Sequence, residues 1–488
     1  MTSKCVGISG FAVYVPPYRI DLEDWCSWTK TPWDKTCAVV GRSFRMRGPH
    51  QSVYTMAATA VMRLIERYDI DPKRVGFLGL GTESSTDNSA GAVIIKGMLD
   101  EALRMKSLQP LNRNCEVPEI KHACLGGIYA LKHGLRYLAL EEDDRCAIVV
   151  SADIAEYARG SSGEPTQGAG AVAMLLEQNP KILAVELKHV GSASAYRVVD
   201  FRKPVLRNII RGTLNCHFQD LPVFNGKYSI TCYLDETLHA LQDMLRRMGK
   251  KPSDYYRSLT AAFMHRPYHR MPVISFAMSY LFGLAKNGTA GREELIKHCD
   301  HARMDVDEII KEMRSTPDIL QLVKDRNIDE DAYPLSIQLL KNFCTSDFFE
   351  DVVAAKMSLG AEAMKDIGNV YCAALPAWIA AGLEEALAQK QDIKGGHILA
   401  VGYGSGDAAE AIPMVVMDGW EKATSQINFN ASLQPQQNLT QMQYESLHDT
   451  GDAQGLEHPS EGFVVDSIGS NAHPSFSDEG IEYYRFVR

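Results

Sequence analysis

The sequence has no run of apolar residues long enough to cross a membrane, and its N-terminus has no charged segment leading into an apolar signal core. It also has no CxxC pair among its 11 cysteines, which indicates reduced thiols rather than a disulfide framework or a zinc cluster. We therefore expect a cytoplasmic protein without membrane contact or bound metal. Positive charge is scarce too: the formal net charge of −10 disfavours a general affinity for nucleic acid.

An internal repeat is the most informative feature of the 488 residues, which are enough for more than one hydrophobic core. Residues 72–178 and 251–418 each contain an apolar strand, a stretch of helical periodicity and two further apolar runs, in the same order. Continuous apolar strands that alternate with helices are typical of sheets covered on both faces. Two such copies predict the α/β class, as a layered α/β/α/β/α sandwich from a duplicated βαβ-type half.

Three further stretches lie outside the repeat. Residues 283–350 have a charged helical pattern and are predicted to be a helical insertion, which either caps a substrate channel or fills a surface. Residues 194–234 are predicted to be irregular, and 424–462, rich in Gln, Asn and Ser, to be a loose connector. The predicted division of the chain is an N-terminal half at 1–190, a C-terminal half at 191–422, and a connector with final strands packed on the core at 423–488.

Cys124 follows an apolar turn and directly precedes the helical stretch of the first copy. A helix N-terminus stabilises a thiolate through its partial positive charge and free N–H groups, and the same groups can form half of an oxyanion hole. The alternative is a small buried cysteine, the commoner fate of this residue type. Position alone favours neither interpretation.

Each copy ends its first strand on an ionisable residue, Glu83 in the first and His265 in the second. Two acid–base groups at equivalent strand ends, with a thiol at a helix start, predict a converging catalytic trio. The alternatives are a carboxylate that caps the following turn and a structural histidine. His269 lies four residues after His265, as in a zinc-binding helix, but the glutamate of that motif is missing and Pro267 interrupts it, so we reject a metal site.

The glycine-rich stretch at 402–406 lacks the lysine and the spacing of a phosphate-binding loop. Glycines at a strand end instead permit close approach of the backbone to a ligand. The backbone N–H of Ser405 is therefore a candidate for the second oxyanion donor.

A series of motifs in order along residues 5–420 resembles the 3-hydroxy-3-methylglutaryl-CoA synthase family, which has the thiolase fold. The motifs are Gly81-Thr-Glu-Ser, Ala123-Cys-Leu-Gly-Gly, Asp153-Ile-Ala-Glu-Tyr-Ala, Glu164-Pro-Thr-Gln-Gly, Asp200-Phe-Arg-Lys-Pro, Asn225-Gly-Lys-Tyr-Ser, His265-Arg-Pro-Tyr, Gly368-Asn-Val-Tyr and Tyr403-Gly-Ser-Gly. The resemblance implies that acetyl-CoA acylates Cys124, that Glu83 deprotonates the acetyl methyl, and that His265 orients acetoacetyl-CoA. It also implies hydrolysis of the enzyme thioester, no metal or redox cofactor, a homodimer, and a place in the mevalonate pathway of isoprenoid biosynthesis.

Residues that contact substrate are implied position by position. Thr166, Ser229, Asn369, Tyr403 and Ser405 resemble residues around the acyl-pantetheine chain, and Arg270 stands where the family has a lysine that meets a CoA phosphate.

Three departures from the family leave the thioester carrier open. Leu125 replaces the usual tyrosine after the nucleophile, the segment 205–220 is longer than expected, and the continuation after His265 differs. One alternative is the polyketide β-branching relative, which uses acyl-carrier-protein substrates and which the run from Glu164 resembles. Another is a non-catalytic scaffold that binds thioesters.

Overall fold

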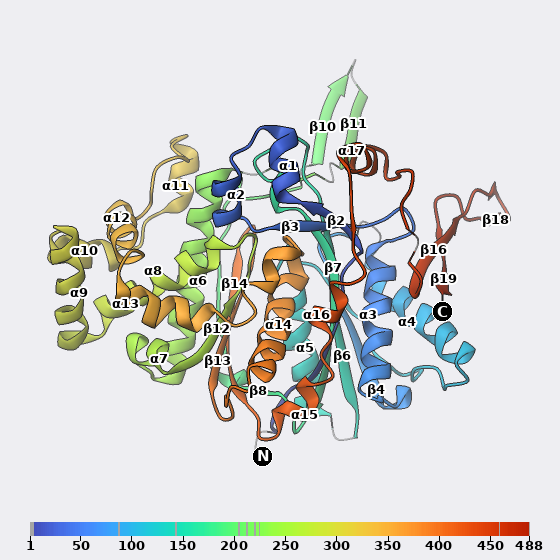
Figure 1. The fold of residues 1–488 in the computed structure, drawn as a ribbon, viewed down its shortest axis with the longest axis horizontal. Helices are drawn as coiled ribbons and strands as arrows, with labels where there is room; N and C mark the ends of the chain where they lie inside the picture. Colours follow the sequence, from blue (N-terminus) through green and yellow to red (C-terminus); the bar gives the residue numbers. More distant parts are fainter. Residues whose placement is uncertain are drawn as a thin grey trace.

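The computed structural model describes residues 4–85, 88–141, 144–203, 205–210, 213–218, 221–223, 225–457 and 459–487. Its main sheet runs in the order β12-β13-β14-β8-β1-β7-β6-β4-β5, and β9 pairs with β14 (Figure 1). The strands are β1 (Val6–Tyr14), β4 (Val75–Gly81), β5 (Glu119–Ile120), β6 (Cys146–Ala155), β7 (Gly168–Gln178), β8 (Leu183–Val185), β9 (Gly191–Ser194), β12 (Leu259–Met264), β13 (His397–Gly404) and β14 (Ala408–Val416).

The two halves share one strand topology. In the first half β4 pairs parallel with β6, and β6 pairs antiparallel with β7. In the second half β12 pairs parallel with β13, and β13 pairs antiparallel with β14. The short strand β8 pairs with both β1 and β14 and so joins the halves into one sheet. The strand, helix, strand, strand repeat predicted from the sequence is confirmed.

Helices cover the strands in layers (Figure 1). α3 (Val53–Arg67) packs on β1, β6 and β7, and α4 (Gly91–Met105) lies beside α3. α5 (Gly126–Leu140) packs on β4 and β6, α14 (Ala374–Ala388) lies against β12 and β13, and both contribute to one hydrophobic core. α6 (Gly226–Met248) and α8 (Arg270–Lys286) form the outer layer of the second half, with α7 (Pro252–Ser258) beside α8. The order of layers is that of the predicted sandwich.

The stretch predicted as an insertion is helical throughout most of its length. It continues α8 with α9 (Gly288–Ala302), α10 (Val306–Met313), α11 (Ile319–Lys324), α12 (Pro334–Phe343) and α13 (Asp347–Phe349). The prediction of irregular structure at 194–234 was wrong in part, because α6 begins at Gly226 and the antiparallel hairpin of β10 (Val205–Ile210) and β11 (Thr213–Phe218) precedes it. Asp220, at the end of the segment that is longer than in the family, lies outside the described residues.

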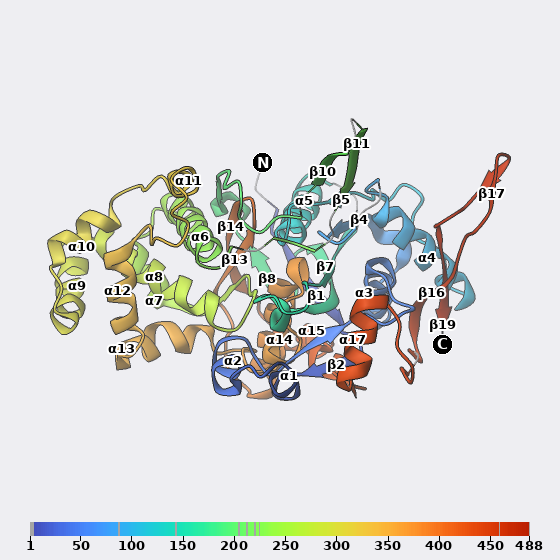
Figure 2. The same cartoon turned by 90° about the horizontal axis from the view of Figure 1, so that it is seen from above.

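The C-terminal stretch is more ordered than the predicted loose connector. It holds α15 (Trp420–Thr424), α16 (Phe429–Ser432), β15 (Gln437–Asn438) and α17 (Gln441–Thr450). Tyr444 and Leu447 of α17 are buried in a small core with residues of β2 (Tyr18–Asp21), β3 (Ser43–Met46) and α1 (Leu22–Thr29), which orders this helix. Near α1 lies α2 (Trp33–Val39). The last strands are β16 (Gly462–Ile468), β17 (Ala472–His473), β18 (Phe476–Ser477) and β19 (Glu482–Val487). β16 and β19 pack on α3 and α4 through Phe463 and Phe486, whereas β17 and β18 project from the body of the protein (Figure 2).

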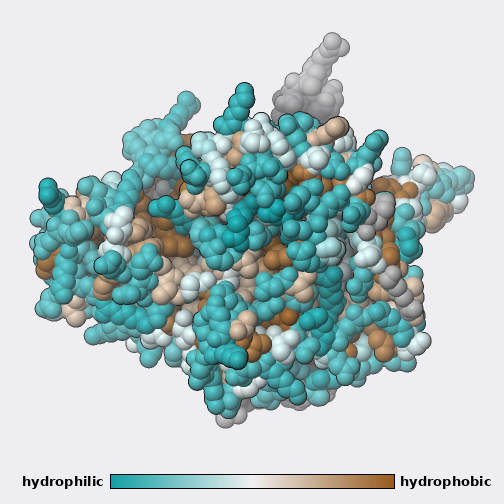
Figure 3. All heavy atoms as spheres, viewed as in Figure 1, coloured by the Kyte–Doolittle hydropathy of each residue, from teal (hydrophilic) through white to brown (hydrophobic). Residues whose placement is uncertain are grey.

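Polar side chains dominate the face seen in Figure 3, as expected when the apolar residues are buried between layers. No helix in the described part of the chain is long and apolar enough to span a membrane.

Candidate active site

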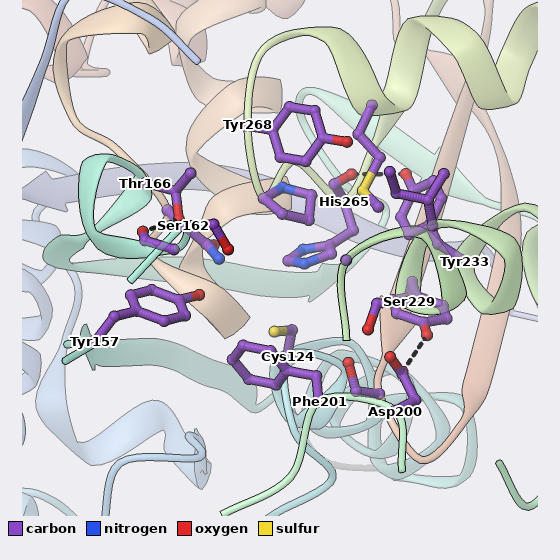
Figure 4. A pocket seen from close by; sticks show the side chains of 18 of the residues that line it. Cys124, Tyr157, Ser162, Thr166, Asp200, Phe201, Ser229, Tyr233, His265 and Tyr268 are labelled. Atoms are coloured by element: carbon purple, nitrogen blue, oxygen red, sulfur yellow. Dashed lines mark hydrogen bonds between the residues drawn. The ribbon is translucent and has the colours of Figure 1, made fainter. Parts of the chain in front are cut away.

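A cavity of about 400 Å³ lies between the two halves, and both Cys124 and His265 line it (Figure 4). Its wall is mainly aromatic and aliphatic, with a few hydroxyl and amide groups among them. The lining residues that matter below are Cys124, Tyr157, Thr166, Asp200, Phe201, Ser229, Tyr233, His265, Tyr268, Asn369, Tyr371, Tyr403 and Ser405. A concave, largely apolar space with a few convergent polar groups is the usual form of a small-molecule site.

Glycines bring the end of β4 against the start of α5. A Cβ on Gly81 would lie 2.3 Å from the Cα of Gly127, so only glycine permits this approach. The preceding residue of the nucleophile turn, Ala123, has a left-handed φ of 41°, which is unusual for a residue with a Cβ. Gly404 at the end of β13 packs equally closely, because a Cβ there would lie 2.9 Å from the Leu125 nitrogen. The chain thus places backbone of both halves around Cys124.

The Cys124 thiol donates a hydrogen bond to Glu83, with 3.2 Å between Sγ and Oε2. Burial raises the pKa of Glu83 to about 7, and the nearby Asp153 adds to the effect. Burial and the Glu83 carboxylate also raise the pKa of the Cys124 thiol well above its ordinary value. Burial and the adjacent carboxylate therefore act against the thiolate that a helix N-terminus favours. In the structure the Glu83 carboxylate is the hydrogen-bond acceptor of the thiol.

Asp153, fully buried at the end of β6, ties together the loops of the site. Its Oδ1 accepts hydrogen bonds from the Thr82 hydroxyl at 2.8 Å, the Glu83 N–H at 2.8 Å and the Ser84 hydroxyl at 2.7 Å. Its Oδ2 accepts from the Cys372 N–H at 2.8 Å, at the start of the α14 segment. One side chain of the first half therefore fixes the loop of Glu83 and contacts the second half. The Asp153 motif was noted in the sequence, but this function was missed.

His265 is nearly completely buried at the end of β12. Its backbone is held by a hydrogen bond from its N–H to the Val401 carbonyl at 2.7 Å, and its carbonyl accepts from the Tyr233 hydroxyl at 2.7 Å. Burial lowers the pKa of the imidazole to about 3, so the ring is neutral at physiological pH. A neutral imidazole donates one hydrogen bond and accepts another, as required of a group that polarises a ketone. The Tyr403 ring stacks against it, with 6.4 Å between ring centroids.

Five of the six predicted substrate-contacting residues line the cavity: Thr166, Ser229, Asn369, Tyr403 and Ser405. The Ser229 hydroxyl is buried and has no hydrogen-bond partner among the described residues, so it is available to a ligand. The sixth, Arg270, is exposed at the start of α8 and is not part of the cavity wall. Its predicted contact with a CoA phosphate would lie outside the enclosed space. Within the described insertion at 283–350, no residue lines the cavity.

Sequence reasoning missed the aromatic wall around the nucleophile. Tyr157, Phe201 and Tyr371 pack edge to face with ring centroids 5.8 to 6.4 Å apart, in one cluster with Cys124. These residues come from three separate stretches of chain, so no local pattern joins them. All three belong to motifs noted for the resemblance, which is the only signal that could have identified them.

Comparison with known proteins places the chain in a family. The family models described as hydroxymethylglutaryl-coenzyme A synthase N terminal and C terminal match residues 2–181 and 198–454. A hydroxymethylglutaryl-CoA synthase of Enterococcus faecalis is 31% identical over 267 residues, which are 54% of this chain and 62%, less than two thirds, of that protein.

Two solved structures extend the likeness to the whole fold. The structure of MvaS in complex with 3-hydroxy-3-methylglutaryl coenzyme A has a TM-score of 0.76 and 25% identity, over 99% of this chain and 100% of that chain. The curacin biosynthetic pathway HMG synthase, in complex with holo donor-ACP, has a TM-score of 0.69 and 20% identity over the same shares, which shows the fold alone. The thiolase-like α/β fold is confirmed, and the chain belongs to the hydroxymethylglutaryl-CoA synthase family of acyl-transferring condensing enzymes.

Proposed function

We propose that this protein condenses acetyl-CoA with acetoacetyl-CoA and releases 3-hydroxy-3-methylglutaryl-CoA, with Cys124 as the acyl carrier. The observation that carries the proposal is the 3.2 Å hydrogen bond between the Cys124 thiol and the Glu83 carboxylate, at a cavity that His265 also lines. A nucleophile in contact with a base, beside a neutral hydrogen-bond donor, is the arrangement that acyl transfer followed by carbanion addition requires.

In the first step the Cys124 sulfur attacks the carbonyl carbon of acetyl-CoA. Glu83 takes the thiol proton, which compensates for the raised pKa of the thiol, because the proton moves as the C–S bond forms. The tetrahedral oxyanion is stabilised by the backbone N–H groups of Cys124 and Ser405. The bond to the CoA sulfur then breaks, CoA takes the proton from Glu83, and acetyl-Cys124 remains.

Glu83 is then again a carboxylate and removes a proton from the acetyl methyl. A pKa of about 7 leaves a substantial fraction of this base ionised at neutral pH and makes it stronger than an exposed carboxylate. The carbanion attacks the ketone carbon of acetoacetyl-CoA, which forms the new C–C bond. His265 donates a hydrogen bond to the developing alkoxide, and the protonated Glu83 returns its proton to that oxygen.

Water then adds to the thioester that joins the product to Cys124, the Cys124 sulfur leaves with a proton, and 3-hydroxy-3-methylglutaryl-CoA is free with its CoA thioester intact. The aromatic wall of Tyr157, Phe201 and Tyr371 has a role before this stage, since an apolar surround strengthens the electrostatic contacts and limits access of water to the carbanion. A place in the mevalonate pathway, which the family resemblance implies, is part of the proposal.

For the carrier we favour CoA, because the MvaS structure with a bound CoA thioester has the higher similarity of the two solved relatives described above. An acyl-carrier protein is the second candidate, since the curacin synthase, whose structure holds a donor-ACP, also matches this chain over nearly its whole length. A homodimer is part of the proposal and is measured by light scattering of the purified protein.

Two measurements test the proposal. Intact mass after incubation with acetyl-CoA should show one added acetyl group, absent in Cys124→Ala and present in Cys372→Ala, a matched control because Cys372 is also a buried thiol beside the same loop. Release of free CoA on addition of acetoacetyl-CoA should follow. No acetylation would support a non-catalytic scaffold, and turnover only with carrier-bound substrates would support the acyl-carrier-protein alternative.

Glu83→Ala separates the two half-reactions. We expect this variant still to reach full acetylation, but more slowly than wild type, because the substitution removes the base of the first step and also removes one of the groups that raise the pKa of the thiol. Condensation should fall by about 10²- to 10⁴-fold, the contribution of a general base. Loss of acetylation in step with condensation would contradict the role given to Glu83 in the second step.

A further inference from the structure

A second group of buried carboxylates lies directly behind the cavity wall. Asp200 and Asp407 are both almost fully buried, and one side-chain oxygen of each lies with the Cys232 sulfur in a cluster whose atoms are all within 4.8 Å of one another. Asp407 is in hydrogen-bonding contact with Asp200. Two carboxylates this close cannot both be ionised at low cost, because each raises the energy of the other's charged form.

Compensating positive charge is limited at this cluster. The Arg197 guanidinium lies 3.6 Å from Asp407, but it also binds Asp235 at 2.5 Å and Glu236 at 3.1 Å. One cation therefore faces three carboxylates, and Asp200 is a fourth. Burial raises the pKa of Asp407 to about 9, and the charge of Asp200 is the second largest cause. Asp407 is consequently protonated at neutral pH.

Unpaired oxygens point to the same conclusion. Asp200 Oδ1 and Asp407 Oδ2 are buried and have no hydrogen-bond partner among the described residues, although Asp407 Oδ2 lies 3.6 Å from Arg197 Nε. A proton on Asp407 turns one acceptor into a donor and gives the pair a hydrogen bond of its own. The other oxygen of Asp200, Oδ2, accepts from the Tyr403 hydroxyl at 2.8 Å.

We propose that Asp407 is a positioning residue for the condensation: it keeps a proton, donates it in a hydrogen bond to Asp200, and so holds Asp200 as the acceptor that fixes Tyr403 against His265. This inference rests on the proposed function. Tyr403 transmits the effect, because its ring stacks on the imidazole and its hydroxyl is tied to Asp200. Asp407 also follows Ser405 by two residues, and its backbone N–H bonds to the Ala195 carbonyl at 2.7 Å.

Burial keeps the neighbouring phenol and thiol groups protonated through this range. Burial raises the pKa of Tyr403 well above its usual value, and it likewise raises the pKa values of Cys232 and Tyr228. Glu236 has its pKa raised by burial, opposed by Arg197. Loss of the Asp407 proton therefore leaves two adjacent anions behind Tyr403, and condensation should decline as the pH rises through about 9.

The test compares Asp407→Asn, Asp407→Ala and the exposed control Asp418→Asn across the pH range. The Asn amide donates a hydrogen bond as the protonated carboxyl does but does not titrate, so we expect partial rescue at pH 7 and loss of the decline near pH 9. Asp407→Ala leaves Asp200 without its donor, and the condensation rate should fall about tenfold or more. Acetylation of Cys124, followed by intact mass, should remain close to wild type in both variants, which also shows that they fold.

Infrared difference spectra give a readout independent of turnover. The carbonyl band of protonated carboxyls at pH 7 should be weaker in Asp407→Asn than in the wild-type protein by the contribution of one group, while the contribution of Glu83, about half protonated at this pH, is common to both. If the wild type makes no product with any carrier, the proposed function fails while this band still tests the proton.

Four results would overturn the inference. The first is a decline near pH 9 that persists in Asp407→Asn, and the second is a wild-type condensation rate in Asp407→Ala. The third is a loss of Cys124 acetylation in these variants that matches their loss of condensation. The fourth is a metal ion found in the purified protein together with loss of activity when a chelator removes it, since the metal ion would then take the place of the proton.

Discussion

The acid limb of the pH profile follows from the environment of Glu83. With a pKa of about 7, the ionised fraction of this base rises from about one tenth at pH 6 to about nine tenths at pH 8, so the condensation rate should rise about tenfold over that range. A carboxyl at its ordinary value near 4.5 would already be almost fully ionised at pH 6, and the rate would hardly change. The change from 4.5 to 7 corresponds to about 3 kcal/mol in favour of the protonated form.

Two substitutions should move this limb in opposite directions. Lys203 lowers the pKa of Glu83, so Lys203→Met should shift the limb to higher pH. Asp153 raises that pKa, so Asp153→Asn should shift the limb to lower pH. In Asp153→Asn the side-chain NH2 group replaces the oxygen that accepts from the Cys372 N–H, so this N–H loses its acceptor. We expect folding stability to fall by about 1–3 kcal/mol.

The assay is single-turnover condensation, started by adding acetoacetyl-CoA to enzyme that has already been acetylated, so that formation of acetyl-Cys124 does not contribute to the rate. Rates between pH 5.5 and 8.5 are fitted to one ionisation, in solutions of equal ionic strength. A flat profile over this range would refute the assignment of Glu83 as a base with a raised pKa. Shifts of the same sign in Lys203→Met and Asp153→Asn would refute the electrostatic explanation.

Three further outcomes are expected. His265→Ala should still become acetylated, but its condensation rate in the single-turnover assay should fall about 10²-fold or more, because the alkoxide loses its hydrogen-bond donor. Arg270→Ala, at an exposed position outside the cavity, should raise the KM for a CoA substrate and leave kcat nearly unchanged; an unchanged KM would remove Arg270 from the binding site. Glu83→Gln should stabilise the fold, with a gain in melting temperature that grows from pH 5 to pH 8, because a carboxyl whose folded pKa is raised costs stability as pH rises from about 4.5 through 7.

The repeated half was predictable because its signal is periodic and local. Apolar strands and amphipathic helices appear directly in the sequence, and β4, β6 and β7 recur as β12, β13 and β14 at the predicted places. The start of α6 was missed because most side chains of its first turns are buried, so the sequence lacks the alternation of apolar and polar residues that identifies a surface helix. α17 was missed because its polar composition resembles a linker, and only the burial of Tyr444 against distant residues orders it.

The convergence of Glu83, Cys124 and His265 was also predictable, since corresponding strand ends of a duplicated half meet at the same place. The state of the thiol was not. A helix N-terminus favours a thiolate, yet burial and the carboxylate at 3.2 Å raise the pKa of the thiol. Both effects depend on atoms that are far apart in the chain.

For Cys124, some properties follow from the sequence and others depend on the tertiary structure. Its place before a helix, its partner strand ends and the family motifs were all determined by the order of amino acids. Whether its thiol meets a base, which aromatic rings surround it and how Asp200 and Asp407 share a proton behind the wall were decided only by the tertiary structure. The physical reason is that solvent exclusion and Coulomb interactions depend on distances in space. Glu83 meets Cys124, and Asp200 meets Asp407, only through the folding of separate stretches of chain, and Cys124 and His265 line one cavity only when the two halves pack together.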